Sequence, residues 1–199
     1  MIGLAPKPGV KRPKEPKYWT YEELEAQFPP SNEHMELWNG ELVMTPSPDD
    51  AHQRSTFDFA CALRSHVKAN DLGEVFIPPF DMVLAPKRVT QPDVMFVAKK
   101  NASLIRRTLR GAADLVVEVI SIESHHRDRI KKRDLYEQHG VKEYWMIDTV
   151  GGPVEVLFLV AGQYKLVGRW RTGQIARSRL LPGFHVEGSE VLGASGNVD

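Results

Sequence analysis

The sequence predicts a single α/β domain in which helices flank a mixed sheet that carries additional β-hairpins. Three observations support this fold class. The run Leu115 to Ile120 is apolar except for one acid, which is typical of a buried central strand. Helical apolar spacing over residues 50–69 precedes this strand, and a second helical segment, residues 125–139, follows it. We find no internal repeat and no long linker, so one domain over residues 18–192 accounts for the order of elements.

The N-terminal elements have clear start and turn signals. Thr20 and Glu23 have the spacing of a capping box, which predicts a short helix over residues 21–28, before two prolines. Residues 35–44 contain two extended segments around Asn39-Gly40, a dipeptide that favours the positive φ angles of a tight hairpin turn. Before this helix, the proline-rich residues 1–17 predict a flexible basic arm.

The middle of the chain alternates between predicted helix and strand. In the long helix over residues 50–69, Cys61 is interpreted as a small buried hydrophobe. Three strands separated by proline-containing turns follow, over residues 74–77, 81–84 and 93–98. Residues 102–110 are predicted to form a short basic helix.

The C-terminal half begins with the central strand and is predicted to contain a helix, a hairpin of residues 154–160 and 164–170, and a last short extended segment. The helix over residues 125–139 stops at Gly140, a favourable residue just beyond a helix end. We expect the remaining extended segments at residues 144–147, 154–160, 164–170 and 184–186. Residues 193–199 predict a flexible tail.

Composition limits the classes of partner. The 26 basic and 26 acidic residues cancel, so the chain lacks the overall basic excess typical of nucleic-acid binding. Basic residues gather locally instead, in the arm, at 99–110 and at 127–133, either as a solvated surface or as phosphate contacts. The single cysteine indicates a reducing cytoplasm, and no apolar run approaches the roughly 20 residues that span a membrane. A homodimer is a further possibility, through Trp19, Trp38 and Trp170.

Two acids at strand positions point to metal chemistry. Glu118 lies within the apolar central strand, on the same face as Val116 and Ile120, and a carboxylate buried there needs a cation. The alternative is a Glu paired with a basic residue at the end of the sheet. Asp93 follows a proline at the start of another apolar strand, and the alternative there is an ordinary turn Asp. If the two strands pair, the carboxylates could converge on a hard divalent cation such as Mg²⁺.

Lys132 is the candidate for the positive group of the site. Asp128, Lys132 and Tyr136 follow at i, i+4 steps on the predicted helix after Glu118, so they form one stripe. Leu135 beside them indicates that this stripe faces the sheet. The alternative is an exposed lysine among other basic residues.

The motifs together resemble the bacterial putative restriction endonuclease family of the PD-(D/E)XK nuclease superfamily. The resemblance runs from about Tyr18 to Leu192. The segments that carry it are Met35-Glu36-Leu37-Trp38-Asn39-Gly40-Glu41-Leu42, Gln91-Pro92-Asp93-Val94, Leu115-Val116-Val117-Glu118-Val119-Ile120-Ser121, the stripe Asp128-Lys132-Tyr136, Gly140 to Asp148, and Leu181-Pro182-Gly183-Phe184.

The resemblance implies a restriction-endonuclease-like core and assigns roles to individual residues. Asp93 and Glu118 would bind Mg²⁺, or Mn²⁺ in its place, together with the backbone carbonyl of Val119. The superfamily's Glu-x-Lys lysine would fall at position 120, where this chain has Ile120, and the family resembled here places it on the following helix, at Lys132.

Two further residues are second-tier candidates. Glu36 matches an extra acid on an early element, and the alternative is a surface Glu of the hairpin. His52 lies at the start of the long helix, where a capping or packing role competes with a catalytic one.

The predicted function is a Mg²⁺-dependent endonuclease that hydrolyses DNA phosphodiester bonds, with Asp93, Glu118, Lys132 and Glu36 as its catalytic residues. The alternative from another class is a catalytically inactive nuclease-like module for binding or assembly. Hydrolysis of another phosphate substrate is a third reading.

Overall fold

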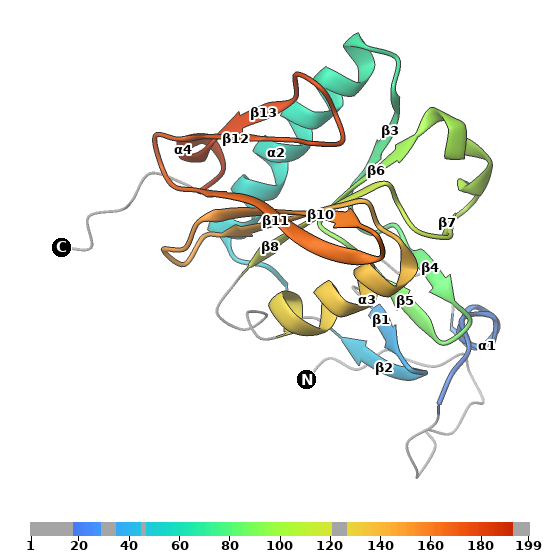
Figure 1. The fold of residues 1–199 in the computed structure, drawn as a ribbon. Coiled ribbons are helices and arrows are strands. Elements are labelled where there is room, and N and C mark those ends of the chain that lie inside the picture. Colours follow the sequence, from blue (N-terminus) through green and yellow to red (C-terminus); the bar gives the residue numbers. More distant parts are fainter. Residues whose placement is uncertain (1–17, 29–34, 45–46, 121–126, 193–199) are drawn as a thin grey trace.

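The computed structural model describes residues 18–28, 35–44, 47–120 and 127–192, except for the side chains of 127–129. The predicted flexible arm and tail lie outside the described residues. The main structural feature is a six-stranded sheet in the order β11-β10-β9-β8-β6-β3 (Figure 1). Its strands are β3 (Gly73–Phe76), β6 (Val94–Ala98), β8 (Leu115–Ile120), β9 (Glu143–Asp148), β10 (Val154–Val160) and β11 (Gln163–Trp170).

The sheet is mixed, as predicted. Strands β8 and β9 run parallel, and the remaining neighbours are antiparallel. The parallel pair requires a crossover, which the helical segment between the two strands provides. Strand β8 is buried along its whole length, because it has neighbours on both sides and helices over both faces.

Helices cover the two faces of this sheet (Figure 1). Helix α2 (Asp50–Ala69) contributes Phe59, Leu63 and Val67 to a core that also contains Val117 and Trp145. On the opposite face lie the π-helical segment η2 (Arg127–Lys132) and helix α3 (Arg133–His139). The core on that face includes Leu135, Tyr136, Val116, Ile120 and Met146.

A second sheet of five strands, in the order β2-β1-β5-β4-β7, packs at the side of the first. Its strands are β1 (Met35–Trp38), β2 (Glu41–Met44), β4 (Met82–Ala85), β5 (Arg88–Thr90) and β7 (Leu109–Arg110). Helix α1 (Tyr21–Gln27) packs against this sheet. Near the C-terminus, β12 (Ile175–Arg177) pairs with β13 (His185–Glu187), and helix α4 (Gly188–Val191) follows.

Many local predictions are confirmed. The Thr20 capping box is present, the long helix spans residues 50–69, and Asn39 and Gly40 both adopt positive φ in the turn of the first hairpin. The predicted helix over residues 125–139 is confirmed from 127 onward, although its first part is π-helical, and its Gly140 cap is left-handed.

Three local predictions are wrong. Residues 102–110 form the end of a 3₁₀ turn, η1 (Lys99–Leu104), and then strand β7, because pairing with β4 overrides the helical spacing. Cys61 is exposed, since it lies on the outer side of α2. Trp19 is buried under α1 rather than available at the surface for a partner. None of the described helices has both the length and the apolar character needed to cross a membrane.

Candidate active site

Glu118 lies on β8 with only 2% of its surface exposed. Both of its carboxylate oxygens accept hydrogen bonds from the helical segment above the sheet. The Lys132 ammonium donates to Oε2 over 2.8 Å, and the Tyr136 hydroxyl donates to Oε1 over 2.6 Å. The donors are four residues apart at the junction of η2 and α3, so the predicted sheet-facing stripe is confirmed for Lys132 and Tyr136. The side chain of Asp128 lies outside the described residues.

Glu36 reaches the same ammonium from the second sheet. It is 3% exposed, and its Oε1 lies 3.2 Å from Lys132 Nζ. The Trp38 indole donates to its Oε2 over 3.0 Å, and the Gln91 backbone N–H donates to Oε1 over 3.3 Å. Glu36 is therefore a buried member of the site and not a surface residue of the hairpin.

Asp93 approaches β8 from the start of β6. The pairing of Val94 with Val117 places Asp93 opposite Glu118 when the register is continued by one residue. The Asp93 Oδ2 accepts the backbone N–H of Val119 over 2.8 Å. Because Val119 follows Glu118, a single peptide unit connects the carboxylate of Asp93 to the residue that bears the second acid.

The carbonyl of Val119 faces the same region. In an extended strand, the N–H and the C=O of one residue point to the same side. Since the N–H of Val119 meets Asp93, its carbonyl is directed to the side of β8 where the paired part of β6 has ended.

His52 contacts Asp93 from α2, the helix on the face of the sheet opposite to the one that Lys132 covers. Asp49 caps α2 by accepting the His52 backbone N–H over 2.8 Å, and this cap fixes the first turn of the helix. The His52 Nε2 then lies 3.2 Å from Asp93 Oδ2, while its Nδ1 lies 3.5 Å from the Thr56 hydroxyl. His52 therefore combines its place in the capped turn with a direct contact to a site carboxylate.

The structure brings Glu36, Glu118 and Lys132 into direct contact, and Asp93 reaches the same stretch of β8 through the backbone N–H of Val119. Glu36, Asp93 and Glu118 each carry −1 when ionised and Lys132 carries +1, so these four side chains sum to −2. Such an excess of negative charge in a buried cluster favours a divalent cation nearby.

Tyr136 is the residue whose role the sequence reasoning did not assign. Burial raises the pKa of its hydroxyl well above the ordinary value, and the neighbouring Glu118 raises it further, against the opposing effect of Lys132. The hydroxyl is therefore protonated at neutral pH and acts as a fixed donor to Glu118. Its i, i+4 spacing from Lys132 was the available signal.

The donor atoms are of the kind that an open magnesium site uses, rather than a closed one. The carboxylates of Asp93 and Glu118 and the carbonyl of Val119 offer oxygen ligands, which hard cations prefer. Within the described ranges, no three His, Cys, Asp or Glu side chains converge as a metal cage. Mg²⁺ is commonly held by one or two carboxylates with several waters, so these residues could hold it.

Comparisons with known proteins identify the family and the fold. The Uma2 family model, described as putative restriction endonuclease, matches residues 20–189. A crystal structure of a putative nuclease belonging to DUF820 from Anabaena variabilis superposes with a TM-score of 0.73 at 16% identity. The match covers 87% of this chain and 97% of that one, and at this identity it shows the fold. No protein of curated function matches the chain.

Proposed function

The chain belongs to the Uma2 family of putative restriction endonucleases, and from that premise we propose that it is a Mg²⁺-dependent nuclease that cleaves DNA. One observation carries the proposal. Lys132 extends from the helical layer to within 2.8 Å of Glu118 and 3.2 Å of Glu36, beside the peptide that binds Asp93. Two carboxylates from separate sheets therefore share one ammonium, and a third carboxylate binds the peptide next to Glu118 on β8.

Asp93, Glu118 and the Val119 carbonyl would hold the metal. When bound, Mg²⁺ activates water and stabilises the charge that develops on a phosphoryl group. Mn²⁺ has similar ligand preferences and would substitute.

Lys132 would have two roles in this reaction. Its ammonium neutralises part of the carboxylate charge, which allows an anionic phosphodiester to approach. It also provides a donor that can orient the attacking water, and such positioning lowers the barrier without a covalent step. The lysine's place on a helix rather than on β8 makes no difference to this chemistry, because only the position of the ammonium matters.

The remaining residues would position these groups. Tyr136 fixes one oxygen of Glu118, and His52 contacts Asp93 from the capped start of α2. Trp38 and the Gln91 backbone orient Glu36, whose carboxylate in turn contacts Lys132. These contacts would hold each group in position before substrate arrives, as efficient electrostatic catalysis requires.

The basic segment 99–110 is less available for phosphate contacts than its sequence suggested. Lys99 pairs with Asp71, and Arg110 lies 3.4 Å from Glu22 and over the ring of Tyr21. The basic arm lies outside the described residues. Non-specific affinity for DNA would therefore depend on other basic surfaces as well.

The test is cleavage of supercoiled plasmid DNA with Mg²⁺ or Mn²⁺. Glu118→Gln and Asp93→Asn should each abolish cleavage, while Glu74→Gln, at an exposed acid of β3, should leave it unchanged. Equal cleavage by wild type and both site variants would refute the assignment.

An inactive nuclease-like binding module is the second candidate. It is favoured by one observation, that both oxygens of Glu118 already accept hydrogen bonds within the protein. Calorimetric titration with Mg²⁺ separates the two candidates. Binding that disappears in Glu118→Gln supports the nuclease, and heat that is unchanged in that variant supports the inactive module.

A further inference from the structure

A row of side chains runs from the candidate active site across the sheet. Glu118 pairs in register with Met146 on β9, Met146 with Glu155 on β10, and Glu155 with Arg169 on β11. Residues paired in register share one face of a sheet, so all four point toward the face that α3 covers. Neighbouring strands are about 4.8 Å apart, so the backbone of Arg169 on β11 lies about 14 Å from the backbone of Glu118 on β8.

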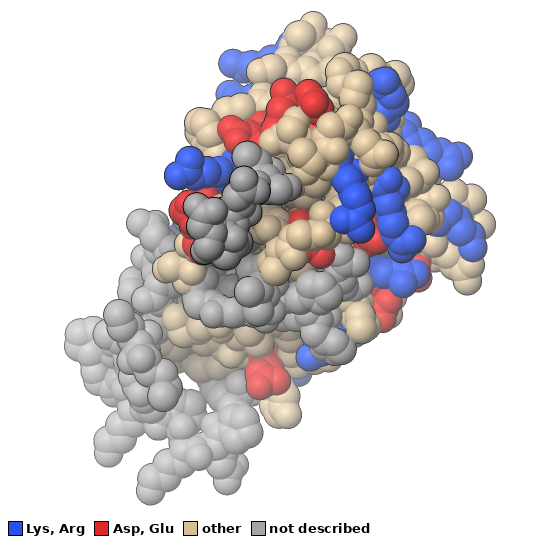
Figure 2. All heavy atoms as spheres, turned by 90° about the vertical axis from the view of Figure 1, so that its left-hand side faces the viewer, with Lys and Arg blue, Asp and Glu red and all other residues tan. Residues whose placement is uncertain are grey.

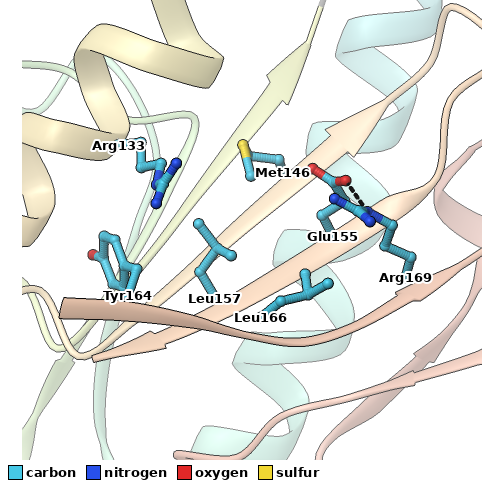
Figure 3. A pocket seen from close by; sticks show the side chains of 7 residues that line it. All are labelled: Arg133, Met146, Glu155, Leu157, Tyr164, Leu166 and Arg169. Atoms are coloured by element: carbon cyan, nitrogen blue, oxygen red, sulfur yellow. Dashed lines mark hydrogen bonds and ion pairs between the residues drawn. The ribbon is translucent and has the colours of Figure 1, made fainter. Parts of the chain in front are cut away.

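A cavity of about 320 Å³ lies at the far end of this row (Figure 3). Met146, Leu157 and Leu166 contribute apolar surface from the sheet, and Arg133 extends toward them from α3. This volume is at the lower end of the range for small-molecule sites, and it suits one nucleotide rather than a large ligand.

The charged groups at the cavity favour an anion. Arg133 is exposed, and it makes no ion pair within the part of the chain that the structure describes. Glu155 binds Arg169 through Nε, and the Arg169 side chain is 61% exposed. Two arginines and one glutamate sum to +1, whereas the four charged side chains at the active site sum to −2.

The chain that follows Arg169 adds to this positive field. Residues 163–179 contain five basic residues and no acid, and all five are exposed. Figure 2 shows several Lys and Arg side chains close together on one side of the molecule. This basic segment was not among the clusters recognised from sequence, since its charges are spread over fifteen residues.

Tyr164 belongs to the apolar part of the cavity lining. Its hydroxyl donates to the Val141 carbonyl over 2.9 Å, so its phenol end is anchored in the protein. Tyr164 and Leu157 are 6% and 7% exposed, so they form a small apolar floor of the cavity, which a sugar or the edge of a base can contact.

We propose that this cavity is a nucleotide subsite for the substrate strand, in which Arg133 and Arg169 bind a backbone phosphate and the apolar floor takes one sugar and base. The inference rests on the proposed nuclease function. At 3.4 Å per nucleotide along a stacked strand, 14 Å corresponds to about four nucleotides from the scissile phosphate. Arg133 directly follows Lys132. The same turn of helix would therefore position the Arg133 guanidinium and the Lys132 ammonium along the DNA strand.

The test measures binding of a fluorescein-labelled 12-nucleotide single-stranded DNA by anisotropy, in EDTA, so that cleavage does not interfere. Arg133→Gln and Leu166→Glu alter the cavity, and Lys165→Gln alters the same strand on its opposite face. Each change lowers the net charge by one. The two cavity variants should raise Kd about three- to tenfold and the Lys165 control less than twofold. Arg133→Gln should also lower the slope of log K against log salt by about 0.7, the value for one lost phosphate contact.

Equal losses in all three variants would mean a general electrostatic effect and would overturn the proposal, as would unchanged binding in the two cavity variants. The same 12-mer without its bases should bind wild type at least several-fold more weakly. Equal binding of the abasic strand would overturn the nucleotide assignment. Since none of these readouts uses cleavage, an uncleaved plasmid with this binding pattern would refute the nuclease and retain the subsite. Plasmid cleavage by the wild type, together with unaltered DNA binding by the cavity variants, would support the nuclease and refute the subsite.

Discussion

Replacement of Lys132 by methionine should destabilise the protein more than any other single change at the site. The variant keeps the length of the side chain but leaves Glu36 and Glu118, which are 3% and 2% exposed, without their shared ammonium. Removing one partner from a buried ion pair costs about 3–5 kcal/mol, because the remaining charge is left in a medium of low dielectric. At about 2–4 °C per kcal/mol for a chain of this size, the melting temperature should fall by about 6–20 °C.

The assay is thermal unfolding at pH 7, followed by circular dichroism, with Lys131→Met as the matched control. Lys131 is exposed and adjacent, so its replacement should change the free energy of unfolding by less than about 0.5 kcal/mol. Melting temperatures within about 2 °C of each other for the two variants would refute the view that Lys132 neutralises buried charge.

The pH dependence of this deficit has a definite sign. Without the ammonium, burial raises the pKa of the two carboxyl groups in the folded variant above the unfolded value of about 4.3. A carboxyl group whose pKa is raised in the folded state lowers the free energy of unfolding at pH values above its unfolded pKa. At lower pH the group is protonated in both states and no longer lowers this free energy. The difference between Lys132→Met and wild type should therefore shrink as the pH falls toward about 4.

Three further predictions concern other buried polar groups. Tyr136→Phe should cost about 1–3 kcal/mol in urea unfolding, because the buried Glu118 loses a hydrogen bond. For Asp114, burial alone would raise the pKa, but hydrogen bonds, chiefly from Lys142, hold the pKa below its ordinary value. This carboxylate therefore adds stability above about pH 4 that is lost as the pH falls through the lower folded pKa, and Asp114→Asn should lose less stability on acidification in that range. Glu143→Gln should cost about 2–3 kcal/mol and speed proteolysis of residues 171–192, because its carboxylate accepts four hydrogen bonds, three of them from residues 178–180.

Each of these has a control or a contradicting outcome. Tyr18→Phe, at an exposed tyrosine, should not change urea unfolding, and an equal loss in both tyrosine variants would contradict the role given to the Tyr136 hydroxyl. Parallel acid-unfolding curves for wild type and Asp114→Asn would contradict the direction of that pKa shift. A Glu143→Gln protein whose C-terminal segment resists protease like wild type would show that those hydrogen bonds do not hold it.

Much of the main sheet could be predicted because its signals are local. The apolar run around Glu118 identifies a buried strand wherever it pairs, and the i, i+4 spacing identifies the inward face of a helix without knowledge of what lies opposite. The same local reasoning failed at residues 102–110, where spacing suggested a helix. There, a two-residue pairing with β4 decided the structure, and no property of the segment itself reveals that partner.

Local signals also predicted only part of the candidate site. The sequence by itself determined that Glu118 needed a cation and that Lys132 and Tyr136 share a face. Only the tertiary structure placed Glu36 on the same lysine from another sheet, brought His52 to Asp93, and aligned Glu118 with Arg169 across four strands. The physical reason is that the direction of a side chain follows from the local repeat of its own element, which is two residues in a strand and i, i+4 spacing in a helix. Strand register, in contrast, follows from contacts between residues far apart in the chain.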